Sequence, residues 1–324
     1  MEALNEQFVD CLSRRIKIEV EPASQAHQEV RAVLEADPQL KAWEVDTILI
    51  GSYARAVAIY PCHDVDVFVK LPKCPEMDPE RVFTAVQRPL RAHYKERAKE
   101  QRRSMKIEGF EDGLSVDAVP AVPAGEHWRI PQTDAARVKN QWEPTDPERL
   151  GELTSARNAA SPVVNGRGSY VPMVKLIRQV RSHHVGDDKP SSLYFEFLAY
   201  WAFEQLPVGF SYAELLAVTL DRVATRLESG VVVTDPAMGT PYTTAPTDNE
   251  LRQAGEAFRG LAKEAAAALT MERCPGAAAW RRILGRNPRG AVFPLPAGCD
   301  ETGKAIGSVV ANRDTGSDES RRFA

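Results

Sequence analysis

Two aspartates in alternate positions are the residues of this sequence best suited to chemistry. Asp64 and Asp66 lie in DVDVFVK (64–70), where acidic and apolar residues alternate. This alternation predicts a β-strand whose successive side chains point to opposite faces, so the two carboxylates share one face, roughly 6 to 7 Å apart. Like charges at that spacing raise each other's pKa unless a cation lies between them. Mg²⁺ is the expected cation, because it prefers oxygen ligands and is commonly held by one or two carboxylates with substrate phosphates.

A turn that is suited to binding phosphate precedes these acids. The apolar run Val45–Ile50 predicts a strand that ends at Gly51 and Ser52, and a short helix is expected over Tyr53–Ile59. Glycine allows a close backbone approach, serine adds a hydroxyl, and a helix start offers free N–H groups and a positive dipole end. The sequence therefore predicts a phosphate site beside a metal site.

The order G-S-x-x-R, a spacer and then D-x-D in an apolar strand resembles the nucleotidyltransferase fold of DNA polymerase β and its relatives. Within that superfamily, the sequence is most similar to the bacterial cGAS/DncV-like nucleotidyltransferases (CD-NTases), which make cyclic oligonucleotide signals in anti-phage defence (CBASS). The resemblance implies an α+β fold with two lobes: a polymerase-β-like core with a mixed sheet, followed by a helical C-terminal lobe like that of oligoadenylate synthase.

A third carboxylate follows from this resemblance. The segment GLSVDAVPAVPA (113–124) predicts a strand over Leu114–Val119 that ends at Pro120, and its Asp117 matches the family's third acidic position. The resemblance implies that Asp64, Asp66 and Asp117 are catalytic and bind two Mg²⁺ ions, for which Mn²⁺ is an acceptable substitute. Such a pair of ions activates the attacking hydroxyl and steadies the triphosphate and leaving group. Asp117 is also a candidate acceptor for the proton of that hydroxyl.

Two residues of the second lobe are implied to bind the nucleotide. In the predicted amphipathic helix YVPMVKLIRQVRSHH (170–184), Lys175 matches the family's lysine that contacts the donor triphosphate, where a point charge is useful. Ser192 matches a serine that reaches the nucleotide phosphate, and Glu196, four residues later, is expected to be structural. Gly51, Ser52, Lys175 and Ser192 are therefore the candidate nucleotide-binding residues.

The remaining pattern divides the chain into three parts. Residues 1–165 are expected to form the catalytic lobe, with two N-terminal helices over residues 3–36 separated at Glu19–Ser24. Residues 166–296 should form the helical lobe around a buried helix at 189–203, and residues 297–324 a flexible tail. A strongly basic helix is expected over Arg81–Ser104, either as a solvated face or as a groove for nucleic acid or a partner.

Composition sets limits on the class of protein. The chain has 324 residues, 43% hydrophobic and 27% charged, which is ordinary for a soluble globular protein, and it shows no targeting segment or membrane span, so a cytoplasmic location is expected. The net charge of −4 argues against binding to duplex nucleic acid. Five cysteines without metal-site spacing favour reduced thiols over a disulfide framework or zinc site: Cys11, Cys62, Cys74, Cys274 and Cys299.

The resulting hypothesis is a Mg²⁺-dependent nucleotidyltransferase that condenses nucleoside triphosphates, ATP expected among them, into a cyclic di- or trinucleotide and releases pyrophosphate. The residues themselves support only nucleotidyl transfer, and ring closure rests on the resemblance. Alternatives are a linear template-independent oligonucleotide synthase, an enzyme that modifies a protein or small-molecule hydroxyl, and a non-catalytic nucleotide-binding module. The last should have lost a carboxylate, and none is missing.

Two positions depart from the family pattern, and the partners stay open. Ala56-Val57 replaces the usual Gly-Thr after the arginine, and His63 replaces the usual serine before the first aspartate. The resemblance implies partners from a defence operon: an effector, and a HORMA-type protein or a ubiquitin-transfer-like protein acting on the tail that ends in Arg321–Ala324. It leaves a nucleic-acid activator undecided.

Overall fold

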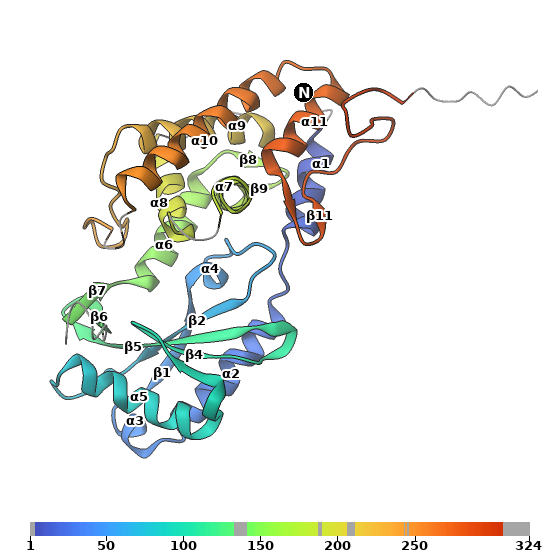
Figure 1. Cartoon of the computed structure of the whole chain (residues 1–324). Coiled ribbons are helices and arrows are strands. Elements are labelled where there is room, and N and C mark those ends of the chain that lie inside the picture. Colours follow the sequence, from blue (N-terminus) through green and yellow to red (C-terminus); the bar gives the residue numbers. More distant parts are fainter. Residues whose placement is uncertain are drawn as a thin grey trace, which may run out of the picture.

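The fold consists of two stacked lobes, one built on a sheet and one built from helices (Figure 1). The computed structural model describes residues 4–132, 141–186, 190–205, 211–242, 244 and 246–306. A short helix, α4 (Gly51–Ala54), lies where the sheet faces the helical lobe (Figure 1). The arrangement confirms the predicted α+β class.

The sheet of the first lobe is mixed and is centred on two parallel strands. In the described residues it has the order β1-β2-β5-β4-β3, with β6 paired to β5 and β7 paired to β6. Strand β2 runs parallel to β5 and antiparallel to β1. The strands are β1 (Asp46–Ile50), β2 (Asp64–Lys70), β3 (Ala98–Glu100), β4 (Met105–Ile107), β5 (Ser115–Ala124), β6 (His127–Gln132) and β7 (Gln141–Thr145). The predicted strand of the two aspartates therefore has the predicted limits.

Helices cover this sheet and fill the second lobe. α2 (Glu21–Glu35), α3 (Pro38–Ala42) and α5 (Pro79–Tyr94) bury apolar faces with the valines of β2, since Val65, Val67 and Val69 are all fully buried. The second lobe contains α6 (Pro147–Ala160), α7 (Tyr170–His184), α8 (Ser192–Ala202), α9 (Tyr212–Glu228), α10 (Asp248–Ala268) and α11 (Arg273–Leu284). Two short ribbons complete it: β8 (Val163–Val164) with β9 (Arg167–Gly168), and β10 (Arg286–Asn287) with β11 (Gly290–Ala291).

The N-terminal segment joins both lobes. Helix α1 (Asn5–Asp10) continues as a π-helical turn (Cys11–Arg15) and packs in the helical lobe, where the Phe8 ring centroid lies 5.2 Å from that of Trp280 and 5.0 Å from that of Phe293. The second predicted helix is α2, which begins at Glu21 with Pro22 in its first turn. The proline expected to break the helix thus starts it, because a first-turn N–H needs no helical partner.

The basic helix predicted over Arg81–Ser104 is ten residues shorter in the structure. α5 ends at Tyr94, and Lys95 has φ of +53°, a left-handed conformation that does not continue a helix. The chain then forms the hairpin β3–β4. Basic residues of α5 and of this hairpin form ion pairs with acids of the same lobe: Arg88 with Asp37, Arg91 with Glu100, Lys99 with Glu108 and Arg103 with Glu143.

Strand β5 runs past the proline at which it was expected to end. Pro120 pairs with Val69 of β2, and the strand continues to Ala124. Beyond Ala121 its partner changes from β2 to β6. The missing N–H of Pro120 therefore falls near a change of partner rather than at a strand end, where it costs little.

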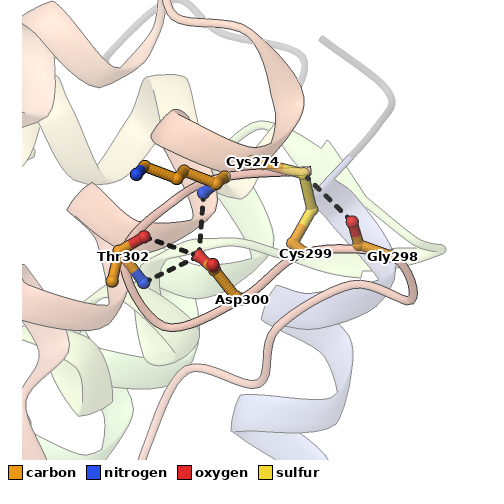
Figure 2. The surroundings of a disulfide bond; sticks show 6 residues. Cys274, Gly298, Cys299, Asp300 and Thr302 are labelled. Atoms are coloured by element: carbon orange, nitrogen blue, oxygen red, sulfur yellow. Dashed lines mark hydrogen bonds between the residues drawn. A yellow bond between two sulfur atoms is a disulfide. The ribbon is translucent and has the colours of Figure 1, made fainter. Parts of the chain in front are cut away.

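The cysteine prediction was wrong for two residues. Cys274, in the first turn of α11, is disulfide-bonded to Cys299, with a Cα–Cα distance of 5.3 Å (Figure 2). The turn after Cys299 is ordered by Asp300, whose Oδ1 accepts hydrogen bonds from the N–H groups of Thr302 and Lys304, both at 2.9 Å (Figure 2). Residues 297–306 are therefore structured, contrary to the expected flexible tail. Residues 307–324, with Arg321–Ala324, lie outside the described residues.

Membrane insertion finds no support in the helices. In the parts of the chain that the structure describes, no helix combines the length and the apolar composition needed to cross a bilayer.

One buried contact predicts a pH dependence of stability. His27 Nε2 of α2 lies 2.9 Å from Oγ1 of Thr47 in β1, and burial and Arg31 lower the pKa of His27. Because the unfolded chain then takes up the proton first, stability should fall as pH drops below about 6.5. Urea unfolding at pH 5, 6 and 7 should show a steeper loss in the native protein than in His27→Gln. The difference has a limit of about 1.4 kcal/mol per pH unit, and parallel profiles would contradict it.

Candidate active site

The pairing of β2 with β5 places the predicted acids beside one another. In this parallel register the Cα partner of Asp66 is Asp117, and that of Asp64 is Ser115. Asp66 also pairs across β1 with Ile50, the residue before Gly51. The strand pattern and the register thus bring all three carboxylates together near the N-terminal ends of the central strands β2 and β5, next to the start of α4.

Gly51 fits closely against one of these acids. It has φ of +69°, and a Cβ built on it would lie 1.9 Å from Oδ2 of Asp66. Only glycine therefore leaves the carboxylate in place. Ser52 follows in α4, a helix of only four residues that is shorter than expected, so its dipole contributes little and the phosphate site rests on the loop amides and the Ser52 hydroxyl.

Asp117 is a half-buried acid with one buried, unpartnered oxygen. Its Oδ1 is inaccessible to solvent and has no hydrogen-bond partner among the described residues. Burial, with the charges of Asp66 and Asp64, raises the pKa of Asp117 to about 7. Burial also raises the pKa of Asp66, with Arg55 opposing the shift. Such carboxylates gain from a cation between them.

Asp64 differs from the other two acids. Its Oδ1 accepts hydrogen bonds from Nζ of Lys106 at 2.7 Å and from Oγ of Ser115 at 2.5 Å. Burial opposes these contacts, but the pKa of Asp64 is lowered overall. Lys106 lies in β4, where its Cα partner is Asp117. Sequence reasoning missed this lysine; its signal was the position between the apolar residues Met105 and Ile107.

The acid pair fits a divalent cation. Asp66 and Asp117 offer adjacent carboxylates and a buried oxygen without a partner, which suits the one or two carboxylates with which proteins commonly hold Mg²⁺. No cluster of three His, Cys, Asp or Glu side chains with metal-site geometry is present within the described ranges. Asp64 is engaged by Lys106 instead, so a third carboxylate ligand requires that this ion pair opens.

A buried ion pair connects the two lobes behind α4. Arg55 follows α4 and donates from Nε to Oε1 of Glu196 at 2.6 Å and from its terminal nitrogen to Oε2 at 3.0 Å. The two side chains are only 5% and 2% exposed. Glu196 lies in α8, so it has the structural role predicted for it. Arg178 of α7 is a second cation, 3.5 Å from Glu196, and its Nε is buried without a partner among the described residues.

The second-lobe nucleotide candidates are placed differently from one another. Burial raises the pKa of Asp66, and Arg55 and Arg178 partly oppose this rise. Burial, Arg167 and Arg178 lower the pKa of Lys175, and no described aspartate affects it. Lys175 lines a separate cavity, described below, that none of the three aspartates lines. Arg178 was missed because two cations one helical turn apart are equivalent in a sequence pattern. Ser192 begins α8, but Ser191 caps it, accepting a hydrogen bond from the Tyr194 N–H at 3.2 Å.

The two departures from the family pattern have structural counterparts. Ala56 has φ of +57°, a left-handed conformation that favours the glycine usual at this position. Val57 is fully buried, so an apolar side chain replaces a hydroxyl there. The carbonyl oxygen of His63 accepts hydrogen bonds from the Ser115 N–H at 2.7 Å and from Ser115 Oγ at 3.0 Å.

The fit of Gly51 predicts a local effect of a single methyl group. In Gly51→Ala the new Cβ overlaps the Asp66 carboxylate, so we expect nucleotidyl transfer to fall at least about tenfold and stability to fall by about 1–2 kcal/mol. Rate and urea unfolding are the measurements. Gly151→Ala in α6, where a Cβ meets no atom within 4 Å, is the matched control; it should leave the rate unchanged and raise stability by about 0.5–1 kcal/mol, because alanine favours the helix. Equal behaviour of the two variants would refute the fit.

Comparison with known proteins finds one family model and several similar structures. Residues 1–158 match the family model of the Second Messenger Oligonucleotide or Dinucleotide Synthetase domain. The Bradyrhizobium diazoefficiens CD-NTase CdnG, solved with GTP, is similar with a TM-score of 0.68 and 16% identity, over 86% of this chain and 94% of that chain. The Escherichia coli CdnC in a HORMA complex has a TM-score of 0.67 and 16% identity, over 90% and 98%.

A third structure extends the likeness. The Vibrio cholerae DncV cyclic AMP-GMP synthase has a TM-score of 0.60 and 11% identity, over 88% of this chain and 86% of that chain. No curated protein is similar enough in sequence to count as a relative. Residues 1–158 match a second messenger oligonucleotide or dinucleotide synthetase domain, and the described chain has the fold of the cGAS/DncV-like structures.

Proposed function

We propose that this protein is a Mg²⁺-dependent synthase that joins nucleoside triphosphates into a cyclic di- or trinucleotide. The observation that carries the proposal is the register of Asp66 against Asp117, with Gly51 fitted against the Asp66 carboxylate. The similar structures support the product class, since one is a cyclic AMP-GMP synthase and another was solved with GTP.

Each residue has a distinct role in this proposal. Asp66 and Asp117 hold the metal, with Asp64 joining them when Lys106 releases it. Bound Mg²⁺ neutralises phosphate charge and polarises the reacting groups. Asp117 is also the proposed acceptor for the proton of the attacking ribose hydroxyl.

The triphosphate needs further positive charge from the second lobe. The loop amides at Gly51 and the Ser52 hydroxyl bind phosphate oxygens, and Ser192 is a candidate for a further contact. Arg178 provides the cation, the role that the resemblance gave to Lys175. Arg55 is held by two hydrogen bonds to Glu196, whereas Arg178 is 3.5 Å from Glu196 and has a buried Nε without a partner among the described residues, so Arg178 is the better placed of the two for an anionic ligand.

The test uses the full chain with all four labelled nucleoside triphosphates and Mg²⁺ or Mn²⁺, followed by phosphatase treatment, chromatography and mass spectrometry. A phosphatase-resistant product of cyclic mass is expected. Asp64→Ala with Asp66→Ala should abolish it. Asp78→Asn, an acid whose side chain is 66% exposed outside the site, should not.

Other products would decide against the proposal in distinct ways. Linear, phosphatase-shortened oligonucleotides would favour a template-independent polymerase. A nucleotide attached to a protein or small molecule would favour a modifying enzyme. Failure to form any product, together with no Mg²⁺-dependent nucleotide binding, would reject nucleotidyl transfer altogether.

The biological setting is part of the same proposal. A role in anti-phage signalling, with an effector that responds to the cyclic product, follows from the family resemblance. The HORMA complex of Escherichia coli CdnC supports testing a HORMA-type partner for this chain. Co-expression with neighbouring genes and measurement of product during phage infection would test this role.

A further inference from the structure

A second cavity lies outside the carboxylate site. It has a volume of about 450 Å³ and lies between the N-terminal segment, α6, the β8–β9 ribbon and α7. The residues after α4 also line it, so it lies against the segment that leads away from Gly51 and Ser52. Asp66 and Asp117 line a different cavity, which opens towards Arg102 and Arg103.

The charges around this cavity are of one sign. Lys175 and Arg167 line it, and no carboxylate is among its described lining residues. Arg55 also lines it, but that charge is engaged by Glu196. Burial, together with Arg167 and Arg178, lowers the pKa of Lys175, and no acid offsets the effect. Two cations without an acid beside them favour an anion.

The remaining lining describes the rest of the occupant. Apolar side chains form one part of the wall: Val9, Leu12, Val171 and Pro172. Hydroxyl and amide groups form another part: Ser13, Thr154, Ser155, Asn158 and Tyr212. A phosphate monoester has several acceptor oxygens that lysine and arginine bind well. The volume lies within the range of small-molecule pockets, which admits a molecule of mononucleotide size.

We propose that this cavity is a second binding site, specific for a phosphate monoester attached to an apolar or aromatic body of mononucleotide size. Lys175 and Arg167 bind the phosphate, and the apolar wall contacts the body. This binding does not depend on the proposed function. Any effect of the occupant on nucleotidyl transfer does rest on the proposed function. Ala54, Arg55 and Ala56 line the cavity at the end of α4, so an occupant contacts the end of the helix that begins at Gly51.

Calorimetric titration with adenosine 5′-monophosphate tests the proposal. The full chain carries Asp66→Asn, so that no turnover occurs. Lys175→Gln and Arg167→Gln should each weaken binding at least about tenfold, and Lys175→Arg should restore it, since it keeps the charge. Arg252→Gln is the matched control, because it removes a cation of α10 whose side chain is 59% exposed and which does not line the cavity. It should change the affinity less than twofold.

Competition separates this cavity from the catalytic site. A non-hydrolysable nucleoside triphosphate should leave the affinity for the monophosphate unchanged. Displacement by the triphosphate would place the monophosphate at the catalytic site, and equal loss in Arg252→Gln and Lys175→Gln would show that the cavity is not its site; either result would overturn the proposal. The proposal would also be overturned if the monophosphate showed no binding at concentrations up to about 10 mM, which corresponds to a very weak Kd. None of these results depends on turnover.

Discussion

Asp117→Asn should lower the rate of nucleotidyl transfer at least about 10³-fold while leaving the protein folded and more stable at pH 8. Asparagine keeps the shape but removes a charge at the reacting centre, where one electrostatic group is worth about that factor. The folded state raises the pKa of Asp117 to about 7, so the native protein loses stability as pH rises from about 4 to about 7, and the whole cost is present at pH 8. The uncharged variant escapes this cost, which is on the order of 4 kcal/mol.

Product formation and urea unfolding at pH 8 together test this result. A residue with only a structural role would lose activity and stability together, whereas here they should change in opposite directions. Asp78→Asn, an exposed acid, should change neither. An Asp117→Asn enzyme that keeps more than a tenth of the native rate would exclude Asp117 from catalysis.

The second large effect concerns the ion pair between the lobes. Glu196→Ala should lower the free energy of unfolding by about 3–5 kcal/mol, because it leaves two buried cations without their acid. Arg55→Ala should cost less, since Arg178 remains 3.5 Å from Glu196. Thermal or urea unfolding of both single variants and of the double variant gives the coupling energy.

A surface pair provides the comparison. Arg252 and Glu256 are 2.9 Å apart in α10, with side chains 59% and 67% exposed. Arg252→Ala should cost about 0.5 kcal/mol or less. If Glu196→Ala cost no more than Arg252→Ala, the pair would not hold the lobes together. A double variant as unstable as the sum of the singles would show the same.

The acidic site could be predicted well because it follows from local rules. The alternation of Asp64 and Asp66 with buried valines determines the face of β2, and a parallel register then places Asp117 against Asp66. Both follow from the two-residue period of a strand. The ion pair of Asp64 with Lys106 could not be predicted, because Lys106 reaches Asp64 from β4 across the sheet, and no local rule gives such a contact.

Other features required three-dimensional information of another kind. The sequence cannot decide whether Lys175 or Arg178 faces the acids, because these neighbouring positions differ by only about 60° around α7 and the choice depends on how that helix is rotated about its axis. Cys274 and Cys299 are 25 residues apart, and only the fold shows that their Cα–Cα distance of 5.3 Å is compatible with a disulfide bond. The lobe boundary at residue 165 stays a prediction.

The position of Phe8 has a consequence for the order of folding during synthesis. Phe8 leaves the ribosome well before the aromatic rings that it packs against, because Trp280 and Phe293 are made more than 270 residues later. The sheet lobe can close without them, whereas α1 cannot be buried until α11 and the segment after it have emerged. The side chain of Phe8 therefore stays without its aromatic partners while the residues between α1 and α11 are made.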